Sequence, residues 1–153
     1  MTYTEPTLTH IDSFIVSGVS VRTKNSDEFN QATAKLPDLW NRFYTTMLAD
    51  LQPGSPIYGV YSDYESDANG LYTVTAGLIL NNQFTTKTPD AIKIQSGNYL
   101  VFQSKGAMPQ AVIDAWKNVW NYFDSKPTHQ RQFISDVETY SGSDEVALHI
   151  GVK

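Results

Sequence analysis

The sequence repeats one order of predicted elements, and this repeat constrains the fold more than any other feature. Hydrophobic periodicity and turn residues predict, in each half, a strand, a helix and two further strands. The predicted elements of the first half are 13–23, 36–51, 57–65 and 71–80. Those of the second half are 98–106, about 108–123, 132–140 and 145–152.

A half of this kind cannot be stable alone, because it leaves a sheet face and an apolar helix stripe uncovered. We therefore expect the halves, about 10–82 and 90–153, to pack as a pseudo-twofold pair within a single effector-binding-like domain, 1–153. The predicted fold is α+β, with duplicated strand-helix-strand-strand units forming an antiparallel sheet. Both main helices lie on one face of that sheet, and a ligand groove runs between them.

The composition excludes several classes of function. The net charge of −5 argues against a nucleic-acid partner, which favours a basic surface, and weakly favours cationic small molecules. The chain has no cysteine, so disulfide and thiolate chemistry are excluded. Its first ten residues carry no signal-peptide pattern, and no apolar stretch is long enough to span a membrane. We expect a cytoplasmic protein without a membrane partner.

The residues that would hold a metal or a cofactor do not form a recognisable pattern. His10, His129 and His149 are scattered, without the spacing of metal ligands. The sequence contains no glycine-rich phosphate loop and no nucleophile elbow. We therefore predict neither a metal nor a cofactor.

The carboxylate of Glu138 is the strongest candidate for chemistry. In the predicted strand 132–140, alternation places one set of side chains on the same face as Glu138 and another set on the opposite face. The first set is Ile134, Asp136, Glu138 and Tyr140, and the second is Phe133, Ser135, Val137 and Thr139. If the first face meets the groove, Glu138 is an anion among apolar and aromatic groups. Such a carboxylate must shift its pKa, find a hydrogen-bond donor or bind a cation. The alternative is an exposed strand residue or one bonded to a tyrosine hydroxyl.

Aromatic side chains are dense, at 12% of the chain, and some of them could form the walls of the groove. Trp40 and Trp116 occupy matching places on the two predicted helices, although tryptophan at such spacing is usually core. The stretch YGVYSDYES contains three tyrosines, of which alternation puts Tyr58 and Tyr61 on opposite faces. Glu65, at the end of that stretch, is predicted to be a solvated strand end.

Three stretches resemble the GyrI-like small-molecule-binding family, which includes the effector-binding domains of MerR- and AraC-type multidrug-responsive regulators. They are PIYGVYSDYESDANGLYTVTAG, GNYLVFQSKGAMPQAVIDAWKNVWNYF and DVETYSGSDEVALHIGVK. The resemblance covers about 13–153 and is closest to free-standing members carried on mobile (integron) gene cassettes, which bind cationic drugs. Regulators of this family also carry a DNA-binding domain, for which 153 residues leave no room. Any transcriptional role would then need a partner protein that contacts DNA.

The resemblance implies a lipophilic cation held over a buried glutamate within a ring of aromatic side chains. Glu138 in DVETY matches that glutamate best, and Glu145 is the second choice. The ring positions that the resemblance implies are Trp40, Tyr61, Tyr72 and Trp116.

The predicted function is binding of hydrophobic, cationic small molecules, without catalysis. One alternative is a GyrI-like hydrolase of reactive electrophiles, in which Glu138 and tyrosines activate water. A second alternative is a protein-interaction module of the gyrase-inhibitor kind.

Overall fold

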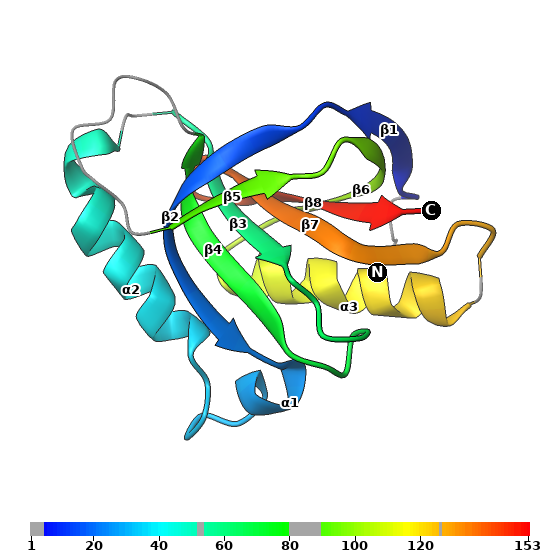
Figure 1. Cartoon of the computed structure of the whole chain (residues 1–153), viewed down its shortest axis with the longest axis horizontal. Coiled ribbons are helices and arrows are strands. Elements are labelled where there is room, and N and C mark those ends of the chain that lie inside the picture. The colour runs from blue at the N-terminus through cyan, green and yellow to red at the C-terminus, as the bar shows by residue number, and fades with distance from the viewer. Residues whose placement is uncertain (1–4, 52–53, 80–89, 126) are drawn as a thin grey trace.

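The computed structural model describes residues 5–51, 54–79, 90–125 and 127–153, and its elements confirm the predicted α+β class. The strands are β1 (Thr7–Ile11), β2 (Phe14–Thr23), β3 (Ile57–Ser62), β4 (Tyr72–Ile79), β5 (Asp90–Ile94), β6 (Gly97–Lys105), β7 (Arg131–Ser141) and β8 (Glu145–Val152). The helices are α1 (Asn25–Glu28), α2 (Leu36–Met47), the short 3₁₀ helix η1 (Leu48–Asp50) and α3 (Gln110–Asp124). All eight strands belong to one antiparallel sheet in the order β1-β6-β8-β7-β3-β4-β2-β5 (Figure 1).

Two long bent strands join the ends of this sheet, which the sequence did not predict. Residues 7–11 pair with 97–101, and residues 14–18 pair with 90–94. A two-residue break at 12–13 divides the first long strand into β1 and β2. A second break at 95–96 divides the other long strand into β5 and β6. The outermost strands of the sheet order are therefore neighbours of the opposite half, and the sheet is strongly curved (Figure 1).

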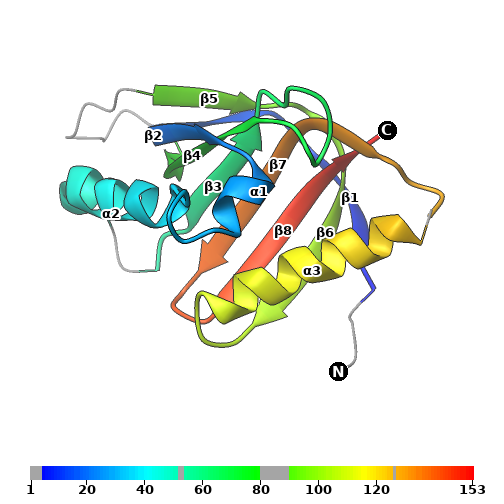
Figure 2. The same cartoon turned by 90° about the horizontal axis from the view of Figure 1, so that it is seen from below.

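Helices α2 and α3 lie on the same side of the sheet, as predicted (Figure 2). The apolar stripe of α2 buries Leu39, Phe43 and Met47 against β2 and β4. The stripe of α3 buries Ala115 and Val119 against β6 and β8. The spacing of three to four residues between buried positions is that of one helix face. The central strands β3 and β7 therefore run between the two helix-covered cores.

The opposite face of the sheet holds a third core under the bent strands. Its buried members are Val16, Val60, Ile94, Tyr99 and Val137. No helix in the described part of the chain is long and apolar enough to cross a membrane.

The predicted alternation of β7 is wrong at its beginning, because a bulge interrupts the strand. The pairing of β7 with β8 shifts between Arg131 and Asp136, and Phe133 has a φ of 56°. An irregularity of this kind reverses the face on which the following side chains lie. Phe133 therefore packs on the helix side against Arg131, whereas Ile134 lines a hollow on the far face together with Ser135. From Ser135 onward the alternation is regular.

Candidate ligand-binding site

Glu138 lies at the centre of the sheet, on the helix side of β7, and it is only 4% exposed. Its carboxylate accepts three hydrogen bonds from aromatic side chains. Oε2 accepts from the Tyr61 hydroxyl at 2.9 Å and from Nε1 of Trp116 at 2.7 Å. Oε1 accepts from the Tyr140 hydroxyl at 2.8 Å. These donors come from β3, α3 and β7, so the site exists only once the two halves have packed together.

All three donors to this carboxylate are neutral. Among the residues that the structure describes, no lysine, arginine or histidine forms an ion pair with Glu138. Burial raises the pKa of Glu138, and the hydrogen bonds from Trp116, Tyr140 and Tyr61 lower it only in part. Burial and the nearby Glu138 charge also raise the pKa values of Tyr61 and Tyr140, which keeps both phenols protonated as donors. The site is a buried acid with donors but, within the described part of the chain, without a counter-cation.

Gly59 is the residue on β3 that faces Glu138 across the strand pair. A methyl group at Gly59 would stand 2.7 Å from Oε1 of Glu138 and 3.2 Å from Cζ2 of Trp40. Real side chains do not tolerate the first distance without movement. The absence of a side chain at this position therefore lets the Glu138 carboxylate and the Trp40 indole approach the same stretch of backbone.

Aromatic rings surround the carboxylate from both helices. On the α3 side, the Trp116 ring lies 5.0 Å from the Tyr61 ring. On the α2 side, the Trp40 ring meets the Tyr140 ring edge-on at 5.4 Å. Trp40, Trp116 and Tyr140 are each half-buried, so every one of them reaches toward the surface. Side chains from both helices thus touch one another around Glu138, and the ligand groove between the helices stays a prediction.

A second buried carboxylate, Asp136, lies two residues away on the same strand face and is fully enclosed. Arg131 forms an ion pair with Asp136 at 2.7 Å, the Tyr64 hydroxyl donates to it, and the Gly151 amide donates at 2.9 Å. Burial is the largest influence on the pKa of Arg131 and lowers it, but the charges and hydrogen bonds of Asp136 and Tyr64 together raise this pKa above its usual value. The guanidinium also lies over the rings of Phe133 at 4.4 Å and Trp116 at 5.9 Å.

The structure brings together four of the residues that the sequence singled out. Trp40, Tyr61 and Trp116 surround Glu138, on the side of the sheet that the helices cover. Tyr72 packs behind Tyr61, with ring centroids 5.3 Å apart, and its hydroxyl donates to Asn25 instead of Glu138.

The other candidate glutamates lie at the surface. Glu145 is exposed at the β7–β8 hairpin and forms an ion pair with Lys105 at 3.5 Å. Glu65 is exposed beside the β3–β4 turn, where it accepts a hydrogen bond from the Leu71 amide. Of these carboxylates only that of Glu138 is buried, which agrees with the first choice made from the sequence.

The sequence analysis did not select three residues that the geometry makes important. Tyr140 is a direct donor to Glu138, and its position two residues along the same strand was the signal for this contact. Gly59 had no signal, because its role depends on which strand pairs with β7. The pairing of Arg131 with Asp136 depends on the bulge of β7, which the pattern of residues did not reveal.

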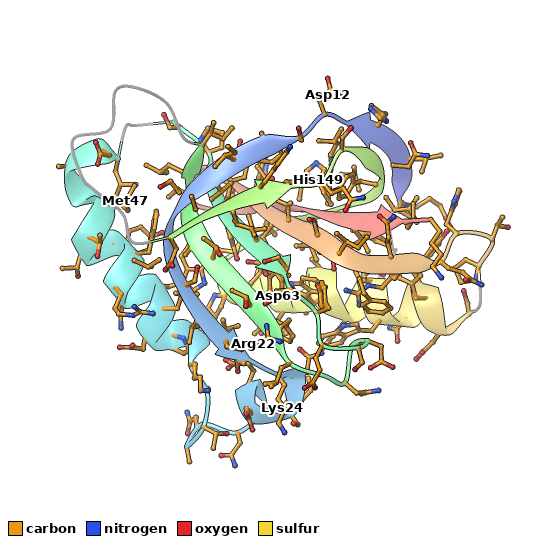
Figure 3. All side chains as sticks on the ribbon, in the orientation of Figure 1. Asp12, Arg22, Lys24, Met47, Asp63 and His149 are labelled. Carbon is orange, nitrogen blue, oxygen red and sulfur yellow. The ribbon has the colours of Figure 1, made fainter. Side chains whose placement is uncertain are left out.

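The far face of the sheet carries a separate hollow of about 750 Å³. Half of its lining residues are serine or threonine, and the buried Ser62 hydroxyl in its wall has no hydrogen-bond partner among the described residues. At its rim, Arg22 donates to the Asp63 carbonyl at 2.8 Å, and both residues lie near the ends of β2 and β3 (Figure 3). The hollow is separated from Glu138 by the sheet itself.

The described residues contain no group of three or more histidine, aspartate or glutamate side chains that could hold a metal ion. The two buried carboxylates Asp136 and Glu138 have separate sets of partners.

Comparison with known proteins identifies relatives over nearly the whole chain. The sequence model of a family described as integron-associated effector binding protein matches residues 7–152. The protein YobU of Bacillus subtilis (strain 168), described as a candidate transcriptional regulator, is 30% identical over 139 residues, 87% of this chain and 84% of YobU.

Solved structures share the fold. Integron cassette protein VCH_CASS2 of Vibrio cholerae is 38% identical, with a TM-score of 0.88 over 99% of this chain and 97% of that one. SAV2435, solved with bound tetraphenylphosphonium, is 23% identical, with a TM-score of 0.74 over 98% of this chain and 94% of that one.

Proposed function

Because the chain belongs to the family of integron-associated effector binding proteins, we propose that it binds lipophilic cations at Glu138. Binding of a small-molecule effector is the property that the family description states. The nature of the effector and the place where it binds are our proposal.

This proposal rests on the observation that no cation of the described residues pairs with Glu138. Burial of an anion is unfavourable unless a positive charge or strong donors compensate it. Neighbouring Asp136 shows one way in which this fold compensates a buried carboxylate, with a buried arginine. Glu138 has only three neutral donors, and burial raises its pKa. A ligand cation next to Glu138 would supply the missing charge, and a neutral ligand would not.

The aromatic surroundings favour a cation that is also large and apolar. Contact of a cation with the face of a tryptophan or tyrosine contributes about 0.5–2 kcal/mol. Apolar surface removed from water adds roughly 25 cal/mol per Å². Glu138 is only 4% exposed, so a ligand must displace side chains before it reaches the carboxylate. Trp40, Trp116 and Tyr140 are the half-buried side chains that reach from this carboxylate toward the surface.

The ligand of SAV2435 supports the same chemical class. Tetraphenylphosphonium is a large apolar cation, and SAV2435 shares the fold of this chain. It is therefore the natural probe for the present protein.

The test compares tetraphenylphosphonium with tetraphenylborate, an anion of nearly the same size and shape, by titration calorimetry. Wild type should bind the cation and reject the anion. Glu138→Gln should weaken cation binding by about 10- to 100-fold, or 1.4–2.8 kcal/mol, because it keeps the size of the side chain and removes the charge. Glu145→Gln, at the exposed hairpin, should leave both titrations unchanged.

Unchanged binding of the cation by Glu138→Gln would contradict the role of this carboxylate. Equal binding of both ions by wild type would contradict charge selection. The hydrolase and gyrase-inhibitor alternatives remain predictions from the sequence. Continued heat release after mixing with a reactive electrophile, dependent on Glu138, would favour the hydrolase.

A further inference from the structure

Two chains of aromatic side chains connect the surface with Glu138, one on each helix side. On the α2 side, Tyr44 is 49% exposed and contacts Trp40, which contacts Tyr140. On the α3 side, Phe29 is 73% exposed and contacts Trp120 edge-on at 5.9 Å. Trp120 in turn lies 6.2 Å from Trp116. A cation could approach the carboxylate along either route, so the question is which one is open.

The α3 route ends at a carboxylate oxygen that already accepts two hydrogen bonds. Oε2 of Glu138 accepts from both Tyr61 and Trp116, which occupies its two lone pairs. Trp116 itself is held on several sides. Its ring contacts Tyr61 at 5.0 Å and lies beneath the Arg131 guanidinium, which the buried Asp136 fixes in place. Displacement of Trp116 would break its hydrogen bond and its contact with Arg131 together.

The α2 route ends at an oxygen with remaining capacity. From the described residues Oε1 accepts one hydrogen bond, from Tyr140, and its second lone pair has no partner among them. This oxygen faces Gly59, where no side chain separates it from the Trp40 indole. Tyr140 is half-buried, and Trp40 is the ring that it contacts. Less therefore has to move on this side before a cation reaches the carboxylate.

On the basis of the function proposed above, we propose that the two oxygens of Glu138 have different roles. Oε2 fixes the carboxylate in the fold through Tyr61 and Trp116. Oε1 receives the cation, which enters from the α2 side past Tyr44 and Trp40. Gly59 determines how closely the charged part of the ligand approaches, and it is a specificity-determining residue of the site.

The chain offers matched pairs of substitutions that distinguish the two routes. Trp40→Phe and Trp120→Phe each shrink a half-buried tryptophan on α2 or α3. Tyr44→Ala and Phe29→Ala each remove an exposed aromatic ring from one route. All four variants are titrated with tetraphenylphosphonium in a calorimeter, and their thermal unfolding is recorded to identify any damage to the fold.

We expect Trp40→Phe and Tyr44→Ala to weaken binding by about three- to tenfold, because the first shrinks and the second removes a ring that the cation contacts. Trp120→Phe and Phe29→Ala should stay within about twofold of wild type. Gly59→Ala should weaken binding most, because its methyl group fills the space beside Oε1. Since that methyl group also presses on Glu138, the tryptophan pair is the decisive comparison.

Larger losses in the α3 pair, or equal losses in both pairs, would overturn the assignment of Oε1 and of the entry side. Either result would leave lipophilic cation binding intact. Failure of wild type to bind tetraphenylphosphonium would instead remove the proposed function, and this inference with it.

Discussion

Asp136 and Glu138 lie two residues apart on the same face of β7, and of the two only Asp136 pairs with a cation from the described residues. Both carboxylates are buried and both accept a tyrosine hydroxyl. The bulge of β7 brings Arg131 back onto the same face, where it meets Asp136. One carboxylate is thus part of the permanent structure, whereas the other depends on neutral donors. The two positions should respond differently to substitution.

Removal of the Asp136 charge should destabilise the protein strongly. Asp136→Asn would leave the buried Arg131 without its partner, and loss of one member of a buried pair costs about 3–5 kcal/mol. The free energy of unfolding in urea measures this effect. Asp38→Asn, in the exposed pair between Asp38 and Arg42, is the control and should change little. A loss at Asp136 as small as that at Asp38 would show that the pair contributes little.

Removal of the Glu138 charge should not destabilise the empty protein at neutral pH. Burial raises the pKa of Glu138 in the folded state above its value in the unfolded chain. The folded protein therefore binds more protons between these two values, and wild-type stability falls as pH rises through that interval. Glu138→Gln lacks this dependence. Urea unfolding at several pH values should show that the free energy of unfolding of the variant rises relative to that of wild type as pH increases. A difference that stays constant with pH would contradict the raised pKa.

Affinity for tetraphenylphosphonium should depend on pH with a definite sign. A bound cation stabilises the Glu138 anion, so the pKa of the occupied site lies below that of the empty site. Affinity should fall as pH decreases from the pKa of the empty site to the lower pKa of the occupied site. Binding in this interval should release a proton. Calorimetry in two buffers with different ionisation enthalpies counts that proton. Proton uptake would contradict the proposal.

The donors to Oε2 should set the pH at which this loss of affinity begins. Trp116 and Tyr61 lower the pKa of Glu138 by hydrogen bonding to its anion. Trp116→Phe and Tyr61→Phe should therefore each raise the pKa of the empty site, and the decline in affinity should begin at a higher pH. Tyr58→Phe, on the far face of the sheet, should leave the pH profile of wild type unchanged. A shift of the same size in Tyr58→Phe would exclude a specific role for the two donors.

Local patterns were sufficient for the helices and the hairpins. The stripe through Leu39, Phe43 and Met47 predicted the buried face of α2, since a helix returns to the same side every three to four residues. Alternation separated Tyr58 from Tyr61 and placed Glu138 on the same face as Tyr140, because side chains of a strand point to opposite faces in turn. These features depend on neighbours in the sequence, so the sequence alone determined them.

Contacts between distant segments could be decided only by the tertiary structure. The pairing of Gly59 with Glu138 depends on the order of strands in the sheet, and the hydrogen bond from Trp116 depends on where α3 crosses it. The ion pair of Arg131 with Asp136 depends on a single irregularity in β7. The sequence placed Asp136 and Glu138 together on one strand face. Burial, donors and counter-charges arise from segments far apart in the sequence, such as Tyr61, which donates to Glu138 from 77 residues away. These contacts decided that, among the described residues, Glu138 is the one left without a cation.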